Sequence, residues 1–440
     1  MIERTFTDAF LKEWIKNNIN DSRNELVILR TIIPWQKITS RLSKFYSPKK
    51  GRHGKSLRIL IGLIIVSRLR LLSDEKVVQQ AKENRYIQYF CNIPDEKLQT
   101  FINPSTICTF RKKIGVEGAS IIEEEAFNIL RKTGVIKNDA QLIDSTVMED
   151  NIIYPTDVQL LYKSFSKMKQ FAKQNDLPVW WDEKYIKQLW RMYNLAKSKE
   201  KINYLWDFYL LFTGAVNIFQ TYLEAVPFLI KKLETGMQLS ELLNLLDDQT
   251  VQKLRGQKSI KNRIVSLDEI DARPIKKGKS HPSCEFGTTL QVSFNREGFM
   301  ITTENFIGQP GDKTLFLGTL DLYKDRMKSY AKKGVTDLGY RSLNNMKKGK
   351  EKIETIFMGR VEDVPEEIRS YCKKARSATE GFIAVAKTWR GFGRSLYKGF
   401  EGDKIWTSLS QLAYNLHKFI QLDTNEKIEE ESLVKLGLYG

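Results

Sequence analysis

Histidine and cysteine are scarce in this chain of 440 residues, which contains three histidines and four cysteines. The cysteines are far apart in the sequence and form no Cys-x-x-Cys pair. Neither a disulfide framework nor the usual spacing of zinc ligands is indicated, and we do not expect a zinc enzyme. A site for Mg²⁺ or Mn²⁺ stays open, because those ions bind carboxylate oxygens.

Long apolar segments are also lacking. The longest apolar run, ILIGLIIV at residues 59–66, is too short to span a bilayer and predicts a buried helix. The first residues, MIERTFTDAF, contain no apolar stretch of the kind found in a signal peptide. We therefore expect a soluble, cytoplasmic protein without a membrane partner.

Positive charge is in excess. The chain has 71 Lys and Arg against 53 Asp and Glu, a formal net charge of +18. This balance favours nucleic acid or an anionic surface as partner. The alternatives are a basic surface that only keeps the protein soluble, or a ribosome-like scaffold. A chain of this length predicts two or three domains.

The N-terminal third has the pattern of short helices joined by tight turns. Its third helix, predicted for residues 105–115, carries Arg111 and Lys112. Such an arrangement suits a helix-turn-helix that contacts DNA, so both residues are predicted DNA contacts. A plain helical bundle with a solvated basic edge is the alternative.

Strand patterns begin after this helical region. Short β-prone runs occur at residues 140–147, 288–295, 299–307, 334–337 and 353–358. Between the first two, residues 158–261 have helical periodicity and contain Trp180, Trp181, Trp190 and Trp206. We interpret these aromatic residues as core rather than as stacking platforms for bases.

Without that helical insertion, the order of elements is that of a ribonuclease H-like fold, an α/β mixed sheet flanked by helices. The domain prediction follows from this order. It comprises a helical DNA-binding domain (1–136), a ribonuclease H-like catalytic domain (137–157 plus 262–420), an all-α insertion (158–261) and an acidic tail (421–440).

Three acids are the candidate catalytic and metal-binding residues. Asp144 and Asp337 lie on strands that are neighbours in a ribonuclease H-like sheet, and Glu380 lies on a following helix. Three converging carboxylates can hold two divalent ions, and this chemistry needs no histidine base. Each acid also has a structural interpretation: a cap, a turn residue, or a surface helix residue paired with Arg376. Rival acids are Glu149, Asp150, Asp157, Asp268 and Asp271.

The helix around Glu380 carries cations on the same side. Arg376 precedes Glu380 by one turn and Lys387 follows it by about two turns. This spacing, Arg-x3-Glu-x6-Lys, resembles the C-terminal signature of bacterial insertion-sequence transposases of the DDE type. Other segments resemble the same group: residues 51–52, 72–74, 110–112, 142–147, 154–157, 277–279, 285–287, 336–340, 388–403 and 415–416.

The resemblance implies a DNA transposase that cleaves the terminal inverted repeats of a mobile element and joins them to target DNA. Asp144, Asp337 and Glu380 would bind two Mg²⁺ or Mn²⁺ ions, and Arg376 and Lys387 would contact phosphates. The glycine-spaced cations Arg390 and Arg394 are further predicted DNA contacts, with a solvated loop as the alternative. The partners implied are double-stranded DNA and a second copy of the chain on DNA, in the nucleoid-associated cytoplasm, with no small-molecule substrate.

Two departures from the pattern stand out. A tyrosine often precedes the arginine by three residues, where this chain has Lys373, and Tyr371 is out of register. The long helical insertion between the aspartates is also unusual. A nuclease that cuts without joining, and a DNA-binding protein without activity, remain as alternative functions.

Overall fold

The computed structural model describes residues 14–423, apart from residues 16, 48–53, 96–97, 99–101, 226–232 and 277–283. Two segments of the predicted resemblance, residues 51–52 and 277–279, lie outside the described residues, as does the predicted tail beyond residue 423. The chain forms two compact units. The first comprises Met1–Met148, Thr289–Phe306 and Pro310–Gly440, and the second comprises Glu149–Thr288 with Ile307–Gln309.

The first unit begins with a set of helices. Their bounds are α2 (Glu25–Ile32), α3 (Trp35–Leu42), α4 (Leu57–Leu69), α5 (Asp74–Glu83), α6 (Arg85–Cys91) and α7 (Pro104–Lys132), with the 3₁₀ turn η1 (Ser43–Phe45) after α3. Side chains cap several of them, as when Ser73 accepts a hydrogen bond from the backbone N–H of Lys76 at the start of α5. α4 is buried on all sides because nearly all of its residues are apolar, as predicted for residues 59–66.

The helix predicted for residues 105–115 is the first part of α7. The backbone of Gly115 is not helical, with a φ of 58° and a ψ of −159°, so the expected end of this helix near Gly115 is confirmed. A second helical segment follows directly after the kink and runs to Lys132, and its residues Ile121, Ile122 and Phe127 are buried in the same core.

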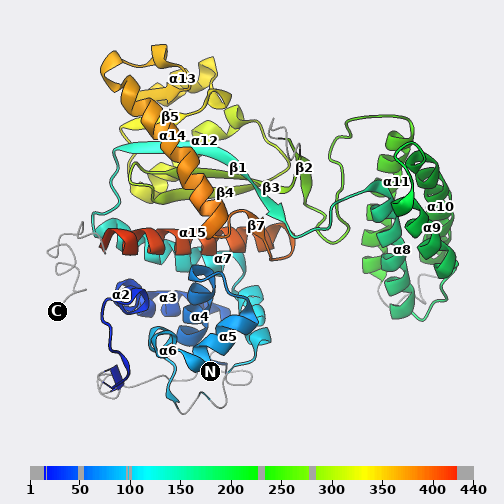
Figure 1. Cartoon of the computed structure of the whole chain (residues 1–440), viewed down its shortest axis with the longest axis horizontal. Helices are drawn as coiled ribbons and strands as arrows, with labels where there is room; N and C mark the ends of the chain where they lie inside the picture. Colours follow the sequence, from blue (N-terminus) through cyan, green and yellow to red (C-terminus); the bar gives the residue numbers. More distant parts are fainter. Residues whose placement is uncertain are drawn as a thin grey trace. The chain divides into compact units, whose positions relative to one another are not determined.

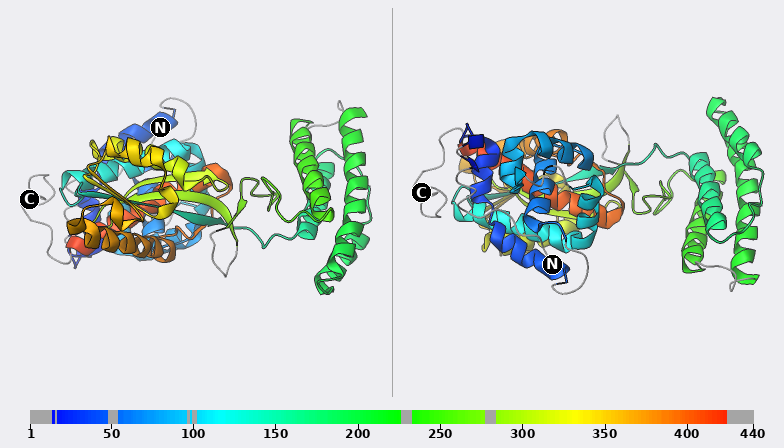
Figure 2. Two further views of the ribbon diagram at one scale, coloured as in Figure 1. Left: turned by 90° about the horizontal axis from the view of Figure 1, so that it is seen from above. Right: turned by 90° about the horizontal axis from the view of Figure 1, so that it is seen from below.

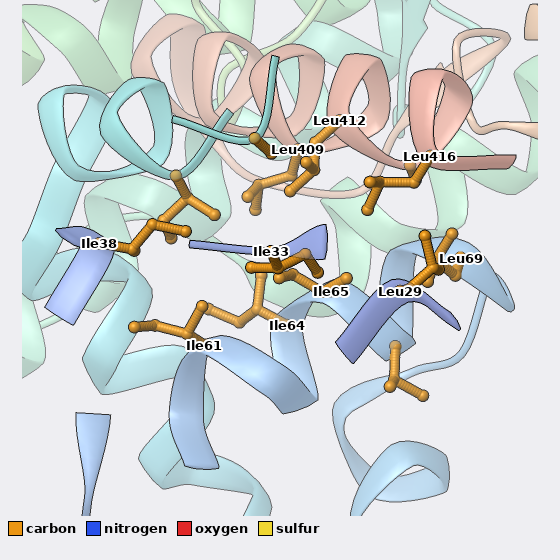
Figure 3. Packing of buried hydrophobic residues seen from close by; sticks show 14 of the residues in the cluster. Leu29, Ile33, Ile38, Ile61, Ile64, Ile65, Leu69, Leu409, Leu412 and Leu416 are labelled. Carbon is orange, nitrogen blue, oxygen red and sulfur yellow. The ribbon is translucent and has the colours of Figure 1, made fainter. Parts of the chain in front are cut away.

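The C-terminal helix α15 (Gly399–Asp423) packs into the N-terminal helices. Its buried leucines lie against α2, α4 and the residue that follows α2, as Figure 3 shows for Leu409, Leu412, Leu416, Leu29, Ile33, Ile61, Ile64, Ile65 and Leu69. The blue N-terminal helices and the red C-terminal helix lie against one another in Figure 1 and in both views of Figure 2. The segments predicted as the N-terminal and catalytic domains therefore share one compact unit and one hydrophobic core.

The rest of the first unit contains most of a mixed sheet, of which residues 149–150, 273–275, 285–288 and 307 belong to the second unit. The strands are β1 (Ala140–Asp150), β2 (Arg273–Ile275), β3 (Glu285–Phe294), β4 (Met300–Ile307), β5 (Lys333–Thr336), β6 (Thr355–Met358) and β7 (Arg394–Ser395). The strand order is β2-β3-β1-β5-β6, with β4 paired to β3 and β7 paired to β1. β1, β5 and β6 are parallel neighbours, whereas β3 and β4 form an antiparallel hairpin. The predicted hairpin and the strands at both aspartates are confirmed.

Helices cover both faces of the sheet. These are α12 (Asp312–Met327), α13 (Leu343–Lys350) and α14 (Glu366–Trp389), with 3₁₀ turns η4 (Leu338–Tyr340) and η5 (Val361–Asp363) between them. Leu142 of β1 packs in a cluster with residues of α14, whereas the next residue, Ile143, packs with residues of α12. Successive side chains of a strand point to opposite faces, so α14 lies on one face, as Figure 1 shows, and α12 on the other.

The second unit contains the predicted helical insertion. Its helices are α8 (Asp157–Gln174), α9 (Glu183–Leu195), α10 (Lys201–Ala225) and α11 (Leu233–Leu254), which enclose a core of their own. Trp180, Trp181 and Trp190 pack against this core as predicted, whereas Trp206 is 50% exposed. Among the described residues, no helix is long and apolar enough to cross a membrane.

Candidate active site

The register of two parallel strands brings the predicted aspartates together. Leu142 of β1 lies opposite Val335 of β5. Continuing both strands by two residues places Asp144 beside Asp337, at a spacing of about 4.8 Å between neighbouring strands. Asp144 shares the sheet face of Leu142, which is the face that α14 covers.

Each aspartate also makes a local hydrogen bond. Asp337 ends its strand and caps η4, where its Oδ1 accepts a hydrogen bond of 2.9 Å from the backbone N–H of Gly339. The Oδ1 of Asp144 accepts one of 2.8 Å from the backbone N–H of Ser145. The turn interpretation of Asp337 is therefore observed.

Helix α14 adds the third acid through an arginine. Nη1 of Arg376 lies 3.0 Å from Oε1 of Glu380 and 3.7 Å from Oδ2 of Asp144. The two carboxylate oxygens are therefore no farther apart than the sum of these distances, about 6.7 Å. The side chains of Asp144, Arg376 and Glu380 are 16%, 26% and 66% exposed, so the cluster is closed at the sheet and open at the helix.

A fourth carboxylate lies in the same place. Asp312 is the first residue of α12, whose N-cap is Gly311. A Cβ built on Gly339 would lie 3.0 Å from Oδ2 of Asp312 and 3.0 Å from Oδ1 of Asp337, so the two carboxylates face the same small space. In the sequence, an acid at the start of a helix has an ordinary dipole explanation, so no local pattern distinguishes it.

The hydroxyl of Tyr340 is close to this group of acids. Burial raises its pKa far above the usual range, and the charges of Asp312, Asp144 and Asp337 raise it further. The hydroxyl donates a hydrogen bond of 2.9 Å to Oε1 of Gln291 on β3. Tyr340 therefore stays protonated, and its buried hydroxyl lies within electrostatic reach of these three carboxylates.

The donor set is suited to hard divalent ions. It consists of carboxylate oxygens without histidine or cysteine, which matches Mg²⁺ or Mn²⁺ rather than zinc. Within the described ranges, no three such side chains already stand close enough to hold an ion. Arg376 occupies the space between Asp144 and Glu380, and these carboxylates would have to leave it to bind a metal.

Two of the rival acids are already neutralised. Asp157 forms an ion pair of 2.6 Å with Arg263. Asp268 pairs with Lys163 at 2.9 Å and with Lys167 at 2.5 Å, and their hydrogen bonds lower its pKa to about 2. Both belong to the second unit and make salt bridges there, which is the structural role expected of a paired surface acid.

The predicted DNA contacts differ in their surroundings. Arg394 is exposed and Lys387 is partly exposed, whereas burial lowers the pKa of Arg390. Arg111 is only 8% exposed, and its guanidinium donates two hydrogen bonds, of 2.6 and 2.7 Å, to the carboxylate of Asp74. The guanidinium of Arg111, which was predicted to contact DNA, is therefore paired with Asp74 instead. Lys112 is exposed.

Tyr371 does not reach the acids. Its hydroxyl donates a hydrogen bond of 3.0 Å to Oδ2 of Asp139, which also pairs with Lys333 at 3.0 Å. Asp139 and Lys333 lie at the beginnings of β1 and β5, several residues from Asp144 and Asp337. Tyr371 therefore contacts the beginnings of β1 and β5, at the opposite end of these strands from the candidate catalytic acids.

Comparisons with known proteins place the chain near one family. A family described as "Transposase domain (DUF772)" matches residues 14–113, which cover α2 to α6 and the start of α7. A Rhizobium meliloti protein described as "Uncharacterized protein ORF8 in nfe locus" is 30% identical over 164 residues, which are 37% of this chain and 79% of that protein. No solved structure matches the chain.

Proposed function

The chain belongs to a transposase-related family, and from this premise we propose that it is a DNA transposase of the DDE type. The observation that carries the proposal is the convergence of three acids from distant parts of the sequence. Asp144 and Asp337 meet through the register of β1 and β5, and Glu380 joins them through Arg376.

The strand order supports a ribonuclease H-like catalytic fold. An antiparallel hairpin, β3 and β4, lies on one side of β1, and the parallel strands β5 and β6 lie on the other. This order puts the first aspartate on the central strand and the second on its parallel neighbour. Helices on both faces complete the arrangement expected from the sequence.

In the proposal, Asp144, Asp337 and Glu380 hold two Mg²⁺ or Mn²⁺ ions. When bound, such a pair of ions activates the attacking oxygen and stabilises the leaving oxygen of an in-line displacement at phosphorus. The carboxylates would supply the ligands, and the buried Tyr340 nearby stays protonated.

The cations of α14 and of the segment after it bind the DNA substrate. Arg376 exchanges its ion-pair contacts with Asp144 and Glu380 for a phosphate, which its planar fork suits, and Lys387 acts as a point charge. Arg390, Arg394 and Lys112 add backbone contacts to double-stranded DNA. Arg111 would not make the direct DNA contact predicted from the sequence, because its guanidinium is paired with Asp74.

The substrate is a transposon end, and the products are a free 3′-hydroxyl and then a new phosphodiester bond to target DNA. Two ends must be held together for this reaction, so a homodimer on DNA is part of the proposal. Because its substrate is DNA, the protein is proposed to act in the nucleoid-associated cytoplasm.

The test is a strand-transfer assay with DNA taken from both sides of the reading frame, where the proposal expects short inverted repeats. With Mg²⁺ the native chain should cut at the repeat and join the 3′-hydroxyl to a second duplex. Glu380→Gln should lose at least about 100-fold in rate, because it removes one ligand of the charge-stabilising site. Glu367→Gln, an exposed acid in the first turn of the same helix, is the matched control and should retain activity.

Cleavage without a joined product would favour the nuclease alternative over a transposase. Unchanged cleavage by Glu380→Gln would remove Glu380 from the site. Neither result depends on the stability of the variant, provided that both variants melt at the temperature of the native chain.

A further inference from the structure

A cavity of about 620 Å³ lies in the first unit, away from the acids. Its wall combines segments that are remote in the sequence: the end of α4, the start of α5, the middle of α7, the glycine-rich segment after α14, and α15. Two predicted DNA contacts, Arg111 and Arg394, line it together. The charged side chains of its wall are Arg68, Asp74, Glu75, Lys76, Arg111 and Arg394.

Arg68 is the feature that indicates a ligand. It is only 4% exposed, its guanidinium lies 3.5 Å from the centre of the Trp406 ring, and its Nη2 donates a hydrogen bond of 2.7 Å to Oγ of Ser410. Its Nε is buried without a hydrogen-bond partner, and no carboxylate within the described part of the chain pairs with it. Burial lowers its pKa to about 10, so it remains charged at neutral pH. An unpaired charge in such a place is costly unless an anion joins it.

The acids of the wall do not fill that role. Both carboxylate oxygens of Asp74 accept hydrogen bonds from Arg111, and Glu75 bonds to the capped start of α5, which lowers its pKa. Arg68 therefore faces the cavity with its charge uncompensated.

The glycine-rich segment is shaped around this arginine. Gly391 has a φ of 78°, and a Cβ at this position would overlap Nη2 of Arg68. Nε1 of Trp406 donates a hydrogen bond of 2.6 Å to the carbonyl of Gly391, which fixes the segment. The glycine is needed both for its backbone conformation and for the close approach of the guanidinium.

We propose that this cavity binds a phosphate group of a DNA strand, with Arg68 as its buried counter-charge and Lys76 and Arg394 at its mouth. The inference rests on the proposed function for the identity of the ligand. A stacked base suits the cavity less well, because Arg68 covers one face of Trp406 and the ring of Tyr397 meets it edge-on at 4.9 Å.

The bound phosphate is not the one that is cut. Nine residues of α14 separate Glu380 from the helix end at Trp389, which is about 14 Å along the axis. The cavity would hold the strand a few nucleotides from the reaction centre and thereby set its position.

The experiment measures DNA binding by the full chain in EDTA, so that cleavage plays no part. Fluorescence anisotropy with a labelled duplex gives the affinity as a function of salt. Loss of one phosphate contact should lower the slope of log K against log salt by about 0.9, equivalent to a roughly threefold smaller loss of affinity between 50 and 200 mM salt. Arg68→Met should show this change and weaker binding at low salt. The matched control is Arg70→Met, an arginine that pairs with Glu25 outside the cavity.

A second pair keeps the test decisive if Arg68→Met does not fold. Lys76→Met removes an exposed cation at the mouth, and Lys82→Met removes one from the same helix outside this cavity. The proposal expects a lower slope for Lys76→Met only. Equal slopes for a folded Arg68→Met and the native chain, or for the two lysine variants, would overturn it.

Inorganic phosphate distinguishes a free anion from a strand. If millimolar phosphate raises the melting temperature of the native chain but Arg68→Met leaves the DNA slope unchanged, the cavity is an anion site and the strand assignment is wrong. If Arg68→Met lowers the salt slope as expected but the native chain never joins DNA strands, the phosphate site in the cavity is supported and the transposase function is rejected.

Discussion

Replacing Arg376 with glutamine should have opposite effects on the metal-free and the metal-bound protein. In the chain without metal, Arg376 lies between Glu380 and Asp144, at 3.0 and 3.7 Å. It neutralises carboxylates that would otherwise repel one another, and the same carboxylates are the proposed metal ligands. Arg376 and a divalent ion therefore compete for the same oxygens.

The size of the effect follows from the exposure of each partner. Glu380 is 66% exposed and one turn away, so that pair contributes about 0.3–0.5 kcal/mol. Asp144 is 16% exposed, which places its interaction between the limits of about 1 kcal/mol in water and about 4 kcal/mol at an effective dielectric constant of 20, each for a separation of about 4 Å. We expect Arg376→Gln to lose about 1–2 kcal/mol, or roughly 2–3 °C in melting temperature, in EDTA.

With Mn²⁺ the variant should gain more stability than the native chain. The native chain must break the Arg376 contacts before it binds the ion, whereas the variant need not. A release of about 1.4 kcal/mol corresponds to roughly tenfold tighter binding, so Mn²⁺ should raise the melting temperature of the variant more than that of the native chain.

Scanning calorimetry in EDTA and at a series of Mn²⁺ concentrations gives both quantities. Lys374→Gln, an exposed cation on the same helix, is the control and should behave as the native chain in both buffers. An Arg376→Gln protein whose rise with Mn²⁺ equals or falls below the native rise would refute the competition, and with it the placement of the metal between these acids.

Three further results are expected. Gly339→Ala places a methyl carbon 3.0 Å from two carboxylate oxygens and should weaken Mn²⁺ binding severalfold in titration calorimetry; unchanged affinity would separate these oxygens from the metal site. Arg326→Met leaves Glu123, whose side chain is 4% exposed, without its two hydrogen bonds, and should cost about 3–5 kcal/mol in urea unfolding; a cost below about 1 kcal/mol would contradict a buried pair. Burial alone would raise the pKa of Asp139, but hydrogen bonds from Lys333 and Tyr371 outweigh burial and lower the pKa. Because the folded-state pKa is lowered, the pair of Asp139 and Lys333 stabilises the fold fully above about pH 4, the ordinary pKa of an aspartate. This contribution disappears as the pH falls through the lowered pKa. Lys333→Gln should therefore destabilise the chain by at most about 1 kcal/mol at pH 7, because solvent screens the partly exposed pair, and by nothing near pH 2; a loss independent of pH would show that the charge is not its cause.

Much of the local structure could be predicted because it depends on neighbours in the sequence. The helical period places Arg376 and Glu380 on one face, and the structure pairs them at 3.0 Å. Short β-prone runs indicated the strand that carries Asp144 and the strand that ends just before Asp337. Composition argued for oxygen ligands and an anionic partner.

Other features could not be predicted from any local pattern. Arg111 has the same context as an exposed basic helix residue, yet Asp74, 37 residues away, binds it. Asp312 resembles an ordinary first-turn acid, yet α12 begins beside Asp337. Arg68 lies near the end of the apolar helix α4, where no local pattern distinguishes it.

Residue order thus specifies which helices and strands form, and which charges each of them presents, because those properties arise within a few turns or pleats. Which charges meet is decided by packing. The pairing of β1 with β5 joins two acids that are 193 positions apart, and the burial of α15 among the N-terminal helices closes the cavity around Arg68. Such contacts depend on complementary apolar faces over the whole first unit, and the free energy of that burial selects one arrangement from many that the local patterns would allow.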